Sequence, residues 1–361
     1  MAKFSEVLTI VNGRNQKQVV CDDGIYPIYG SGGIMGYAND YICKAETVVI
    51  GRKGSINKPI FVETPFWNVD TAFGLCANSE KLNPKYLYYF CEKFDFEKLN
   101  TTVTIPSLTK SNLLNVEIPL PNLKKQKQIV ELLDKVTSLI FLRKQQLSKL
   151  DELVKARFVE MFGDEQTFNK EPLSQNVEEM FIGPFGSSLK NENFVSKENG
   201  YCMVYEQKHA IRKTMDVETR YIDKPKYEEL KRFSIHGGDI IVSCRGTIGE
   251  TYIIPLNAPL GIMHPSIMKI RVKDSIYNRV FFDFLLQEKL KQHEAQANGS
   301  GVKMAVTASA LGKEEFIVPS IPLQKQFSSF VERVDQQKQT VQQSLEKLEL
   351  MKKALMQEYF G

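Results

Sequence analysis

Two stretches of the chain place apolar residues at alternating intervals of four and three. From residue 129 to residue 161, and again from 327 to 359, eight of ten such positions are apolar. This spacing is the contact seam of a coiled coil. Proline is absent from both stretches, and a glycine, Gly163 or Gly361, stands where each helix would stop. The pattern predicts two helices of about 40 residues, each roughly 60 Å long at a rise of 1.5 Å per residue.

A helix of this kind is not stable alone in water, so its seam must be covered. The economical partner for each helix is the other one, and we predict that the two pack together and hold two globular units apart. The alternative is that each helix packs on its own globular domain. The predicted seam residues are Ile129, Leu133, Val136, Ile140, Leu147, Leu150, Val154, Phe327, Val331, Val334, Val341, Leu345, Leu348 and Leu355.

Four seam positions are charged: Arg143, Arg157, Lys338 and Lys352. Charges at such places can set the register and orientation of a helix pair. The alternative is that their aliphatic stems lie along the seam while their heads reach water.

The helices belong to a longer internal repeat. Residues 104–163 align with 302–361 at a constant offset of 198, and 18 of the 60 pairs are identical. Chance would give roughly four, so the repeat indicates a duplicated unit. The sequence predicts a mixed α+β fold in four segments: a globular domain at 1–118, a helix at 119–164, a second globular domain at 165–318 and a second helix at 319–361.

Short strand-like runs and turns alternate in the first globular domain. We predict strands at 19–21, 26–29 and 47–50, a glycine-rich loop at 30–33, a basic turn at 51–55, a helix at 85–99 and a short element capped by Ser111. The second domain follows the same plan, with a glycine-rich loop at 183–188, a strand at 239–243, a turn at 244–249 and a helix at 277–293, after a polar linker at 164–172.

Composition and charge exclude several classes of protein. The fractions of apolar and charged residues, 42% and 25%, are ordinary for a globular chain, and there is no run of 18 apolar residues and no signal-peptide core. We expect a cytoplasmic protein that does not enter a membrane, and the six widely spaced cysteines read as reduced. Both globular domains are electrically neutral, with 12 basic and 12 acidic residues in the first and 20 of each in the second, so net charge alone does not announce nucleic-acid binding.

The sequence contains none of the catalytic motifs considered below. The run Gly30 to Gly36 is one residue too long for a dinucleotide-binding loop, and no phosphate-binding loop or nucleophile elbow occurs. Asn83-Pro84-Lys85-Tyr86 superficially resembles a motif of adenine methyltransferases but reads as a helix N-terminus. The four histidines are far apart, and no cluster has metal-ligand spacing. We predict no catalytic residue, no metal site and no cofactor in this chain.

The order of these features resembles the specificity subunit of type I restriction–modification enzymes. The first repeat reads Pro119-Leu120-Pro121-Asn122-Leu123-Lys124-Lys125-Gln126-Lys127-Gln128-Ile129 before its helix, close to the family's pattern. The second copy departs from it, reading Pro319-Ser320-Ile321-Pro322-Leu323-Gln324-Lys325-Gln326-Phe327. Residues 51–56, 245–249 and 105–113 also resemble recurrent family motifs, so the resemblance spans the chain.

The resemblance implies a subunit without catalysis. The two domains would be target recognition domains, each reading one half of a split DNA sequence, and the antiparallel helices would space them about a pseudo-twofold axis. The helices would also dock two methylation subunits, which bind S-adenosylmethionine. Restriction subunits, which use ATP and magnesium, would join through that complex.

Two alternative functions remain open from the sequence. The first is an enzyme with its own recognition domains, and the second is a two-module scaffold that does not bind DNA.

Candidate DNA contacts come from the glycine-rich loops and basic turns, because glycine lets a backbone approach DNA closely and cations hold phosphates. In the first domain they are Tyr29, Ser31, Arg52, Lys53, Ser55, Asn57 and Lys58. In the second they are Ser187, Ser188, Lys190, Gln207, Lys208, Arg245, Thr247 and Lys303.

Overall fold

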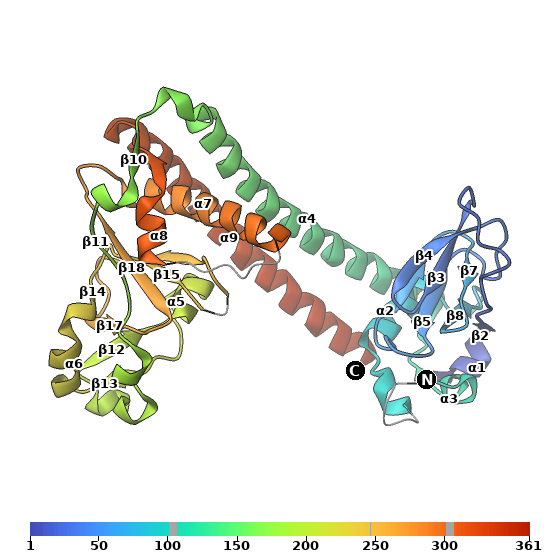
Figure 1. The fold of residues 1–361 in the computed structure, drawn as a ribbon. Coiled ribbons are helices and arrows are strands. Elements are labelled where there is room, and N and C mark those ends of the chain that lie inside the picture. The colour runs from blue at the N-terminus through green and yellow to red at the C-terminus, as the bar shows by residue number, and fades with distance from the viewer. Residues whose placement is uncertain (101–106, 246, 301–306) are drawn as a thin grey trace. The chain divides into compact units, whose positions relative to one another are not determined.

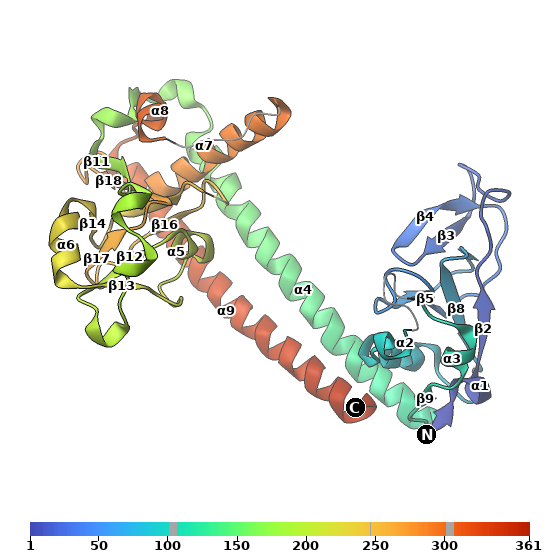
Figure 2. The same ribbon diagram turned by 60° about the horizontal axis from the view of Figure 1, so that its bottom comes forward.

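The computed structural model describes residues 1–100, 107–245, 247–300 and 307–361. The chain divides into two compact units: unit 1 combines Met1–Ser148 with Gln339–Gly361, and unit 2 is Lys149–Lys338. Two helices of 40 residues, α4 (Leu123–Phe162) and α9 (Ile321–Phe360), confirm the length predicted from the seam. Both units contain part of each long helix (Figure 1 and Figure 2).

Unit 1 is built on two small sheets. An antiparallel sheet has the order β2 (Leu8–Asn12), β8 (Ala72–Ala77), β5 (Thr47–Gly51), β6 (Ile60–Val62), and a second sheet has the order β4 (Gly33–Ala38), β3 (Tyr26–Gly30), β7 (Trp67–Asn68). A short ladder joins β1 (Ala2–Lys3) to β9 (Glu117–Ile118). The helical elements are α1 (Phe4–Val7), α2 (Pro84–Lys93), the 3-10 turn η1 (Phe96–Leu99) and α3 (Lys110–Leu114).

Unit 2 repeats this plan with longer insertions. Its antiparallel sheet has the order β11 (Val177–Ile182), β18 (Ile267–Val272), β15 (Ile240–Ser243), β16 (Thr251–Ile253). Its second sheet has the order β13 (Tyr221–Ile222), β12 (Cys202–Tyr205), β17 (Gly261–Met263), β14 (Ser234–Ile235), and β10 (Lys170–Pro172) pairs with β19 (Glu315–Ile317). The helices are α5 (Gln207–Arg212), α6 (Lys224–Leu230), α7 (Arg279–Ser300) and α8 (Ala308–Lys313). Six 3-10 turns complete it: η2 (Glu165–Thr167), η3 (Leu173–Gln175), η4 (Gly186–Ser188), η5 (Asn191–Asn193), η6 (Lys197–Asn199) and η7 (Lys231–Phe233).

Several predicted elements are wrong in their bounds. Residues 19–21 form no strand, because Val20 makes only an isolated bridge to Ala38. The helix expected at 85–99 ends at Lys93, since Phe94 is extended and Asp95 caps the separate turn η1. Thr109, not Ser111, caps α3 by accepting a hydrogen bond from the Asn112 N–H.

The second unit departs from the prediction in the same way. Helix α7 begins at Arg279 rather than 277 and continues to Ser300. The linker expected at 164–172 ends in strand β10, which pairs with β19. In both domains the short, tertiary-paired segments are the ones that local pattern does not define.

A buried glutamine fixes the start of each long helix. In unit 1 the Gln126 side chain accepts a hydrogen bond from the Asn83 N–H (2.8 Å) and donates to the carbonyls of Lys81 (3.0 Å) and Pro121 (2.8 Å). In unit 2 Gln324 does the same with the backbone groups Asn278 N–H, Ile276 C=O and Pro319 C=O. Both glutamines are fully buried. They lie 198 residues apart, so the repeat preserves this joint.

An aromatic residue closes the other end of each helix. Phe360, at the end of α9, packs on Tyr86 and Phe90 of α2, with ring centroids 4.9 and 6.1 Å apart. Phe162, at the end of α4, packs on Phe281 of α7 and Phe327 of α9, at 4.9 and 5.7 Å. The end of one long helix therefore completes the core beside the start of the other, and the two run antiparallel within each unit.

The predicted seam residues face inward in both units. All fourteen are buried or half-buried. In unit 1 an ion pair joins Lys144 of α4 to Glu349 of α9 (2.9 Å), and in unit 2 Lys338 of α9 pairs with Asp151 of α4 (2.7 Å). Glu349 and Asp151 are equivalent in the repeat, so an acidic residue at this place accepts a lysine from the facing helix in each unit.

The other charged seam residues form their polar contacts on their own helix or with α2. Arg143 donates to Gln146 (2.7 Å) and Arg157 pairs with Glu160 (2.7 Å), each three residues along its own helix. Lys352 reaches Glu92 of α2 (3.0 Å). Of the four, only Lys338 forms an ion pair between the long helices among the described residues.

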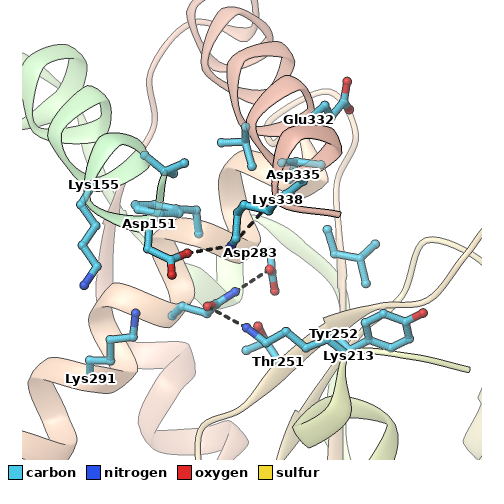
Figure 3. A pocket seen from close by; sticks show the side chains of 16 residues that line it. Asp151, Lys155, Lys213, Thr251, Tyr252, Asp283, Lys291, Glu332, Asp335 and Lys338 are labelled. Atoms are coloured by element: carbon cyan, nitrogen blue, oxygen red, sulfur yellow. Dashed lines mark hydrogen bonds and ion pairs between the residues drawn. The ribbon is translucent and has the colours of Figure 1, made fainter. Parts of the chain in front are cut away.

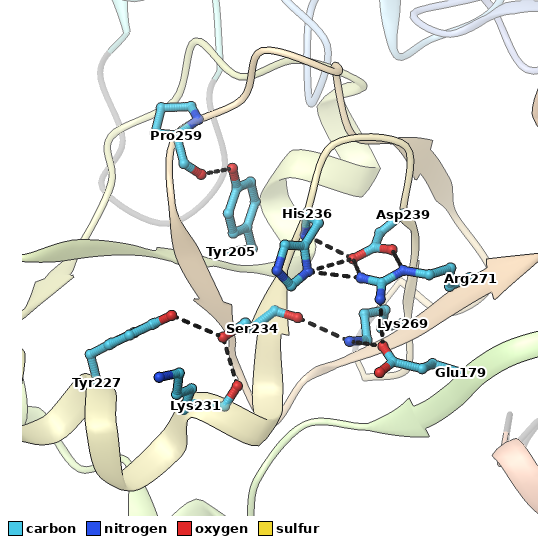
Figure 4. A network of polar contacts seen from close by, with 10 residues as sticks. All are labelled: Glu179, Tyr205, Tyr227, Lys231, Ser234, His236, Asp239, Pro259, Lys269 and Arg271. Atoms are coloured by element: carbon cyan, nitrogen blue, oxygen red, sulfur yellow. Dashed lines mark hydrogen bonds and ion pairs between the residues drawn. The ribbon is translucent and has the colours of Figure 1, made fainter.

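A polar network connects the two four-stranded sheets of unit 2 (Figure 4). The buried Lys269 donates to Glu179 (2.5 Å) and to the Ser234 carbonyl (3.0 Å), and its ammonium lies 4.6 Å from the centroid of the Phe181 ring. Beside it Arg271 binds the buried Asp239 carboxylate through two hydrogen bonds of 2.7 and 2.9 Å. Burial acting alone would raise the pKa of Glu179, but the hydrogen bond and charge of Lys269 hold it below its ordinary value.

We predict that Glu179→Gln lowers the free energy of unfolding by about 2 kcal/mol at pH 7. A fully buried pair that loses one partner costs about 3–5 kcal/mol, and the partial exposure of Glu179 reduces that. Because the folded-state pKa is depressed, the contribution is present above about pH 4.3 and is lost as the pH falls through the folded pKa. Urea unfolding at pH 7 and near pH 3 measures it. Glu178→Gln, at the exposed neighbouring position, is the control, and equal effects of the two changes would contradict the assignment.

Candidate DNA interface

In unit 1 the glycine-rich loop and the basic turn lie together. Strands β3 and β4 pair Gly30 with Gly33, which leaves Ser31 and Gly32 as the turn of a hairpin. A Cβ placed on Gly51 would lie 3.1 Å from the Ser31 Cβ, so the turn of the hairpin touches the end of β5, where the basic turn begins. Gly54 has a φ of +80°, which only glycine adopts readily. The two segments, some 20 residues apart in sequence, thus form one surface.

Exposed cations follow Gly51 in the chain. Arg52, Lys53 and Lys58 are exposed and form no ion pair with any described residue. The Arg52 guanidinium lies 5.7 Å from the Phe73 ring centroid, and the Arg52 backbone is fixed by bonds to Thr71 and Leu108. The turn therefore presents its charges on a rigid backbone.

The remaining candidates of unit 1 differ in availability. Ser55 is exposed, whereas Tyr29 is half-buried with its ring 5.4 Å from that of Phe66. Burial raises the pKa of the Tyr29 hydroxyl. Asn57 is exposed, but its amide donates to Asp95 (2.9 Å) and accepts from the Phe96 N–H (2.7 Å). These bonds give Asn57 a structural task in pinning η1.

In unit 2 the glycine-rich loop lies against His264. A Cβ on Gly183 would lie 2.3 Å from the His264 carbonyl oxygen, so the glycine-rich loop passes directly over this residue. Burial holds the pKa of His264 below its ordinary value; Glu206 acts in the opposite direction, while Arg220, Arg245 and Lys208 lower it further. His264 is therefore neutral near pH 7, and its Nδ1 lies 2.7 Å from the Ser266 hydroxyl.

Glu206 organises the cations around it. Its buried carboxylate pairs with Lys208 (2.8 Å) and with Arg220, whose guanidinium also lies 4.0 Å from the Phe194 ring centroid. Sequence reasoning singled out Lys208 and Arg245 but missed Arg220 and His264. Arg220 directly precedes β13, outside the glycine-rich loops and basic turns, and no local signal marks it.

The other described candidates of unit 2 lie in or beside the glycine-rich loop, at the start of α5 and in the turn after β15. Ser187 and Thr247 are exposed, and Ser188 and Gln207 are half-buried. Lys190 is exposed and lies 3.8 Å from Glu192. Arg245 is exposed and makes no ion pair with a described residue, whereas Lys303 lies outside the described residues.

Each unit also has a groove where α4, α9 and a third helix meet. In unit 2 a cavity of about 570 Å³ lies between α4, α9, α7 and β16 (Figure 3). In unit 1 one of about 360 Å³ lies between α4, α9 and α2. Five lining positions are equivalent in the repeat, pairing Asp151, Val154, Lys155, Asp335 and Lys338 with Glu349, Lys352, Lys353, Thr137 and Ile140.

The side chains that commonly bind metals are dispersed in the described part of the chain. No group of three or more histidine, cysteine, aspartate or glutamate residues among them is placed to hold a metal ion. All six cysteines are free, and burial raises the pKa of Cys43 to about 12 and that of Cys202 and Cys244 to about 11. No helix in the described part is long and apolar enough to cross a membrane. Two different loop surfaces on a duplicated helical frame define a binding protein with two recognition domains.

The family follows from the sequence as a whole. A model of the type I restriction modification DNA specificity domain matches residues 1–152 and 186–350, and the chain belongs to this family. It is a DNA specificity subunit of a type I restriction–modification system with two target recognition domains. Such subunits are not catalytic and bind no cofactor themselves.

Two relatives are named as specificity subunits, and one solved structure has the same fold. A putative type I specificity subunit of Haemophilus influenzae is 28% identical over 263 residues, covering 69% of this chain and 66% of the relative. One from Methanocaldococcus jannaschii is 22% identical over 294 residues, covering 78% and 68%. The matched region thus spans about two thirds of each relative. The S subunit structure from M. genitalium has the same fold, with a TM-score of 0.60, 18% identity and coverage of 100% and 95%.

Proposed function

We propose that this chain selects the DNA sequence on which a type I restriction–modification complex acts, with each domain reading one half of a bipartite asymmetric target. The proposal rests on two basic turns that occupy equivalent positions in the two domains. The turns bearing Arg52 and Arg245 follow β5 and β15, which occupy the same place in the two antiparallel sheets. The residues around the two arginines differ, so two domains with the same architecture would recognise different half-sites.

Base edges specify sequence, whereas cations and backbone amides hold phosphates. Arg52 and Arg245 are the proposed base readers, because arginine binds guanine through two hydrogen bonds. Lys53, Lys58, Lys190, Lys208 and Lys303 are proposed phosphate contacts, and Ser31, Ser55, Ser187, Ser188 and Thr247 are proposed hydroxyl contacts. Tyr29, Asn57 and Gln207 would act from the rims of the same surfaces.

The helices would set the spacing of the half-sites and dock two methylation subunits. Half-sites about 34 Å apart present the same groove face to a pair of related domains. The two grooves at equivalent repeat positions favour two copies of one partner, because equivalent surfaces bind equivalent partners. S-adenosylmethionine would enter with the methylation subunits, and ATP and magnesium with restriction subunits. The assembly would act on DNA in the cytoplasm.

The test is base-resolution mapping of methylation in cells that express this chain with its cognate methylation subunit. We expect a split asymmetric motif that depends on this chain. Exchange of residues 1–118 for those of a relative should change one half of the motif and leave the other half and the spacer unchanged. A complex with an inactivated methylation subunit is the control.

Two outcomes would contradict the proposal. One is a methylation pattern that stays the same without this chain. The other is a partner that copurifies while DNA binding shows no dependence on salt, because contacts to phosphates release counterions and give a steep slope. The second result would favour a two-module scaffold that does not bind DNA.

A further inference from the structure

The β3–β4 hairpin of unit 1 and the residues on either side of it carry several exposed apolar side chains. Between residues 20 and 41, six large ones are exposed: Val20, Ile25, Ile34, Met35, Tyr37 and Tyr41. At the hairpin tip Ile34 is 55% exposed and Met35 is 62% exposed. Single apolar residues are common on surfaces, but a group of them in one short segment marks an interaction site.

The backbone at the tip is shaped to present Met35. Strand β3 pairs Ile28 with Gly36 and the next residue, Tyr29, with Ile34, so Met35 has no partner and forms a β-bulge. A bulge re-aims a side chain out of the alternating pattern of a strand. The glycines on either side of the Ile34–Met35 pair have φ of +122° (Gly33) and +155° (Gly36), although an added Cβ would meet nothing within 4 Å at either position. Their conformation, not crowding, requires glycine.

The tip adjoins the basic turn. Ser31, in the hairpin turn, lies against Gly51, and Arg52 and Lys53 follow directly. The turn of the hairpin that carries the apolar pair thus lies beside a segment with two exposed cations, which form no ion pair with any described acid. A protein partner would have to bring matching acids to this place, whereas DNA offers phosphates along both edges of a groove and apolar base faces between them.

We propose that Ile34 and Met35 form an apolar wedge that enters DNA at a base-pair step within or beside the half-site read by unit 1. The wedge rests on the proposed function of that domain. Isoleucine and methionine are among the side chains that unstack base steps and kink DNA, at an energetic cost that the flanking phosphate contacts offset. Specificity then includes the ease with which the step deforms, so a flexible pyrimidine–purine step is the favoured target.

The experiment uses the whole complex with its methylation subunits and a duplex carrying the mapped motif. A 2-aminopurine at each step of the half-site reports unstacking, and dyes at the two ends report bending. We expect wild type to raise 2-aminopurine fluorescence at one step and to bend the duplex. Met35→Ala and Ile34→Ala should abolish the fluorescence rise, reduce the bend and weaken binding about tenfold, while Met35→Leu should retain all three.

Leu256→Ala is the matched control, since Leu256 is an exposed apolar residue of unit 2, and it should behave as wild type. If both alanine variants unstack and bend DNA as wild type does, the wedge does not exist. If they weaken binding while the fluorescence and the bend persist, Ile34 and Met35 contact a groove wall instead, which also overturns the wedge. Failure of the proposed function is distinguishable, because wild type would then show no motif-dependent binding.

Discussion

Replacing Gln126 by leucine is expected to lower the free energy of unfolding of unit 1 by about 3 kcal/mol. The substitution leaves three partly buried backbone groups without a partner, on Lys81, Asn83 and Pro121. Each unsatisfied group costs about 1–3 kcal/mol, partly offset by about 2 kcal/mol for burying the leucine. The single tryptophan, Trp67, is buried in unit 1, so its fluorescence during urea unfolding reports on this unit.

Gln128→Leu provides the control, because Gln128 lies on the exposed side of the same helix. The equivalent change in unit 2, Gln324→Leu, should leave the Trp67 transition in place and destabilise unit 2 instead. A loss of stability for Gln128→Leu as large as for Gln126→Leu would show that the hydrogen bonds of Gln126 are not responsible.

Phe162→Ala should destabilise unit 2 by about 3–5 kcal/mol, the usual cost of removing a buried phenylalanine ring. Phe162 is 1% exposed and contacts the rings of Phe158, Phe168, Phe281 and Phe327. Hydrogen exchange of β15 and β18 measures the change, since core strands exchange through the largest openings.

Val159→Ala is the control for this substitution, because Val159 is exposed about one turn earlier on the same helix. It should change the exchange rates of β15 and β18 little. If Phe162→Ala leaves protection in those strands unaltered, the end of α4 does not contribute to the core of unit 2.

The helices were predictable because each seam has ten positions, eight of them apolar. A polar residue at any one position therefore leaves the pattern recognisable. The strands were not, because many are only two or three residues long. Strand β7 consists of Trp67 and Asn68, and β13 of Tyr221 and Ile222, so neither shows an alternating pattern. Their positions are set by pairing with distant segments.

In the candidate interface, the local turns were predictable from the sequence and the tertiary contacts were not. Glycine-rich turns are local features, so the sequence predicts that Ser31 and Arg52 lie in turns. Only the fold shows that these two turns meet. Arg220 was missed because strand pairing carries it to Glu206 from outside the loop motifs. Asn57 was chosen for its type and position, and its bonds to Asp95 and Phe96 depend on tertiary structure. Met35 was missed because a bulge is invisible in a short run of residues.

The core of unit 1 is assembled from two segments that are separated in the chain by the whole of unit 2. Phe360 and Met356 belong to the same apolar cluster as Phe4 and Tyr86. Unit 2, by contrast, is one continuous segment. During synthesis on a ribosome the residues that begin unit 1 therefore emerge first, yet their core cannot close until the last turns of α9 have been made. Unit 2 can be complete by then, so the order of translation and the order of completion are opposite for the two units.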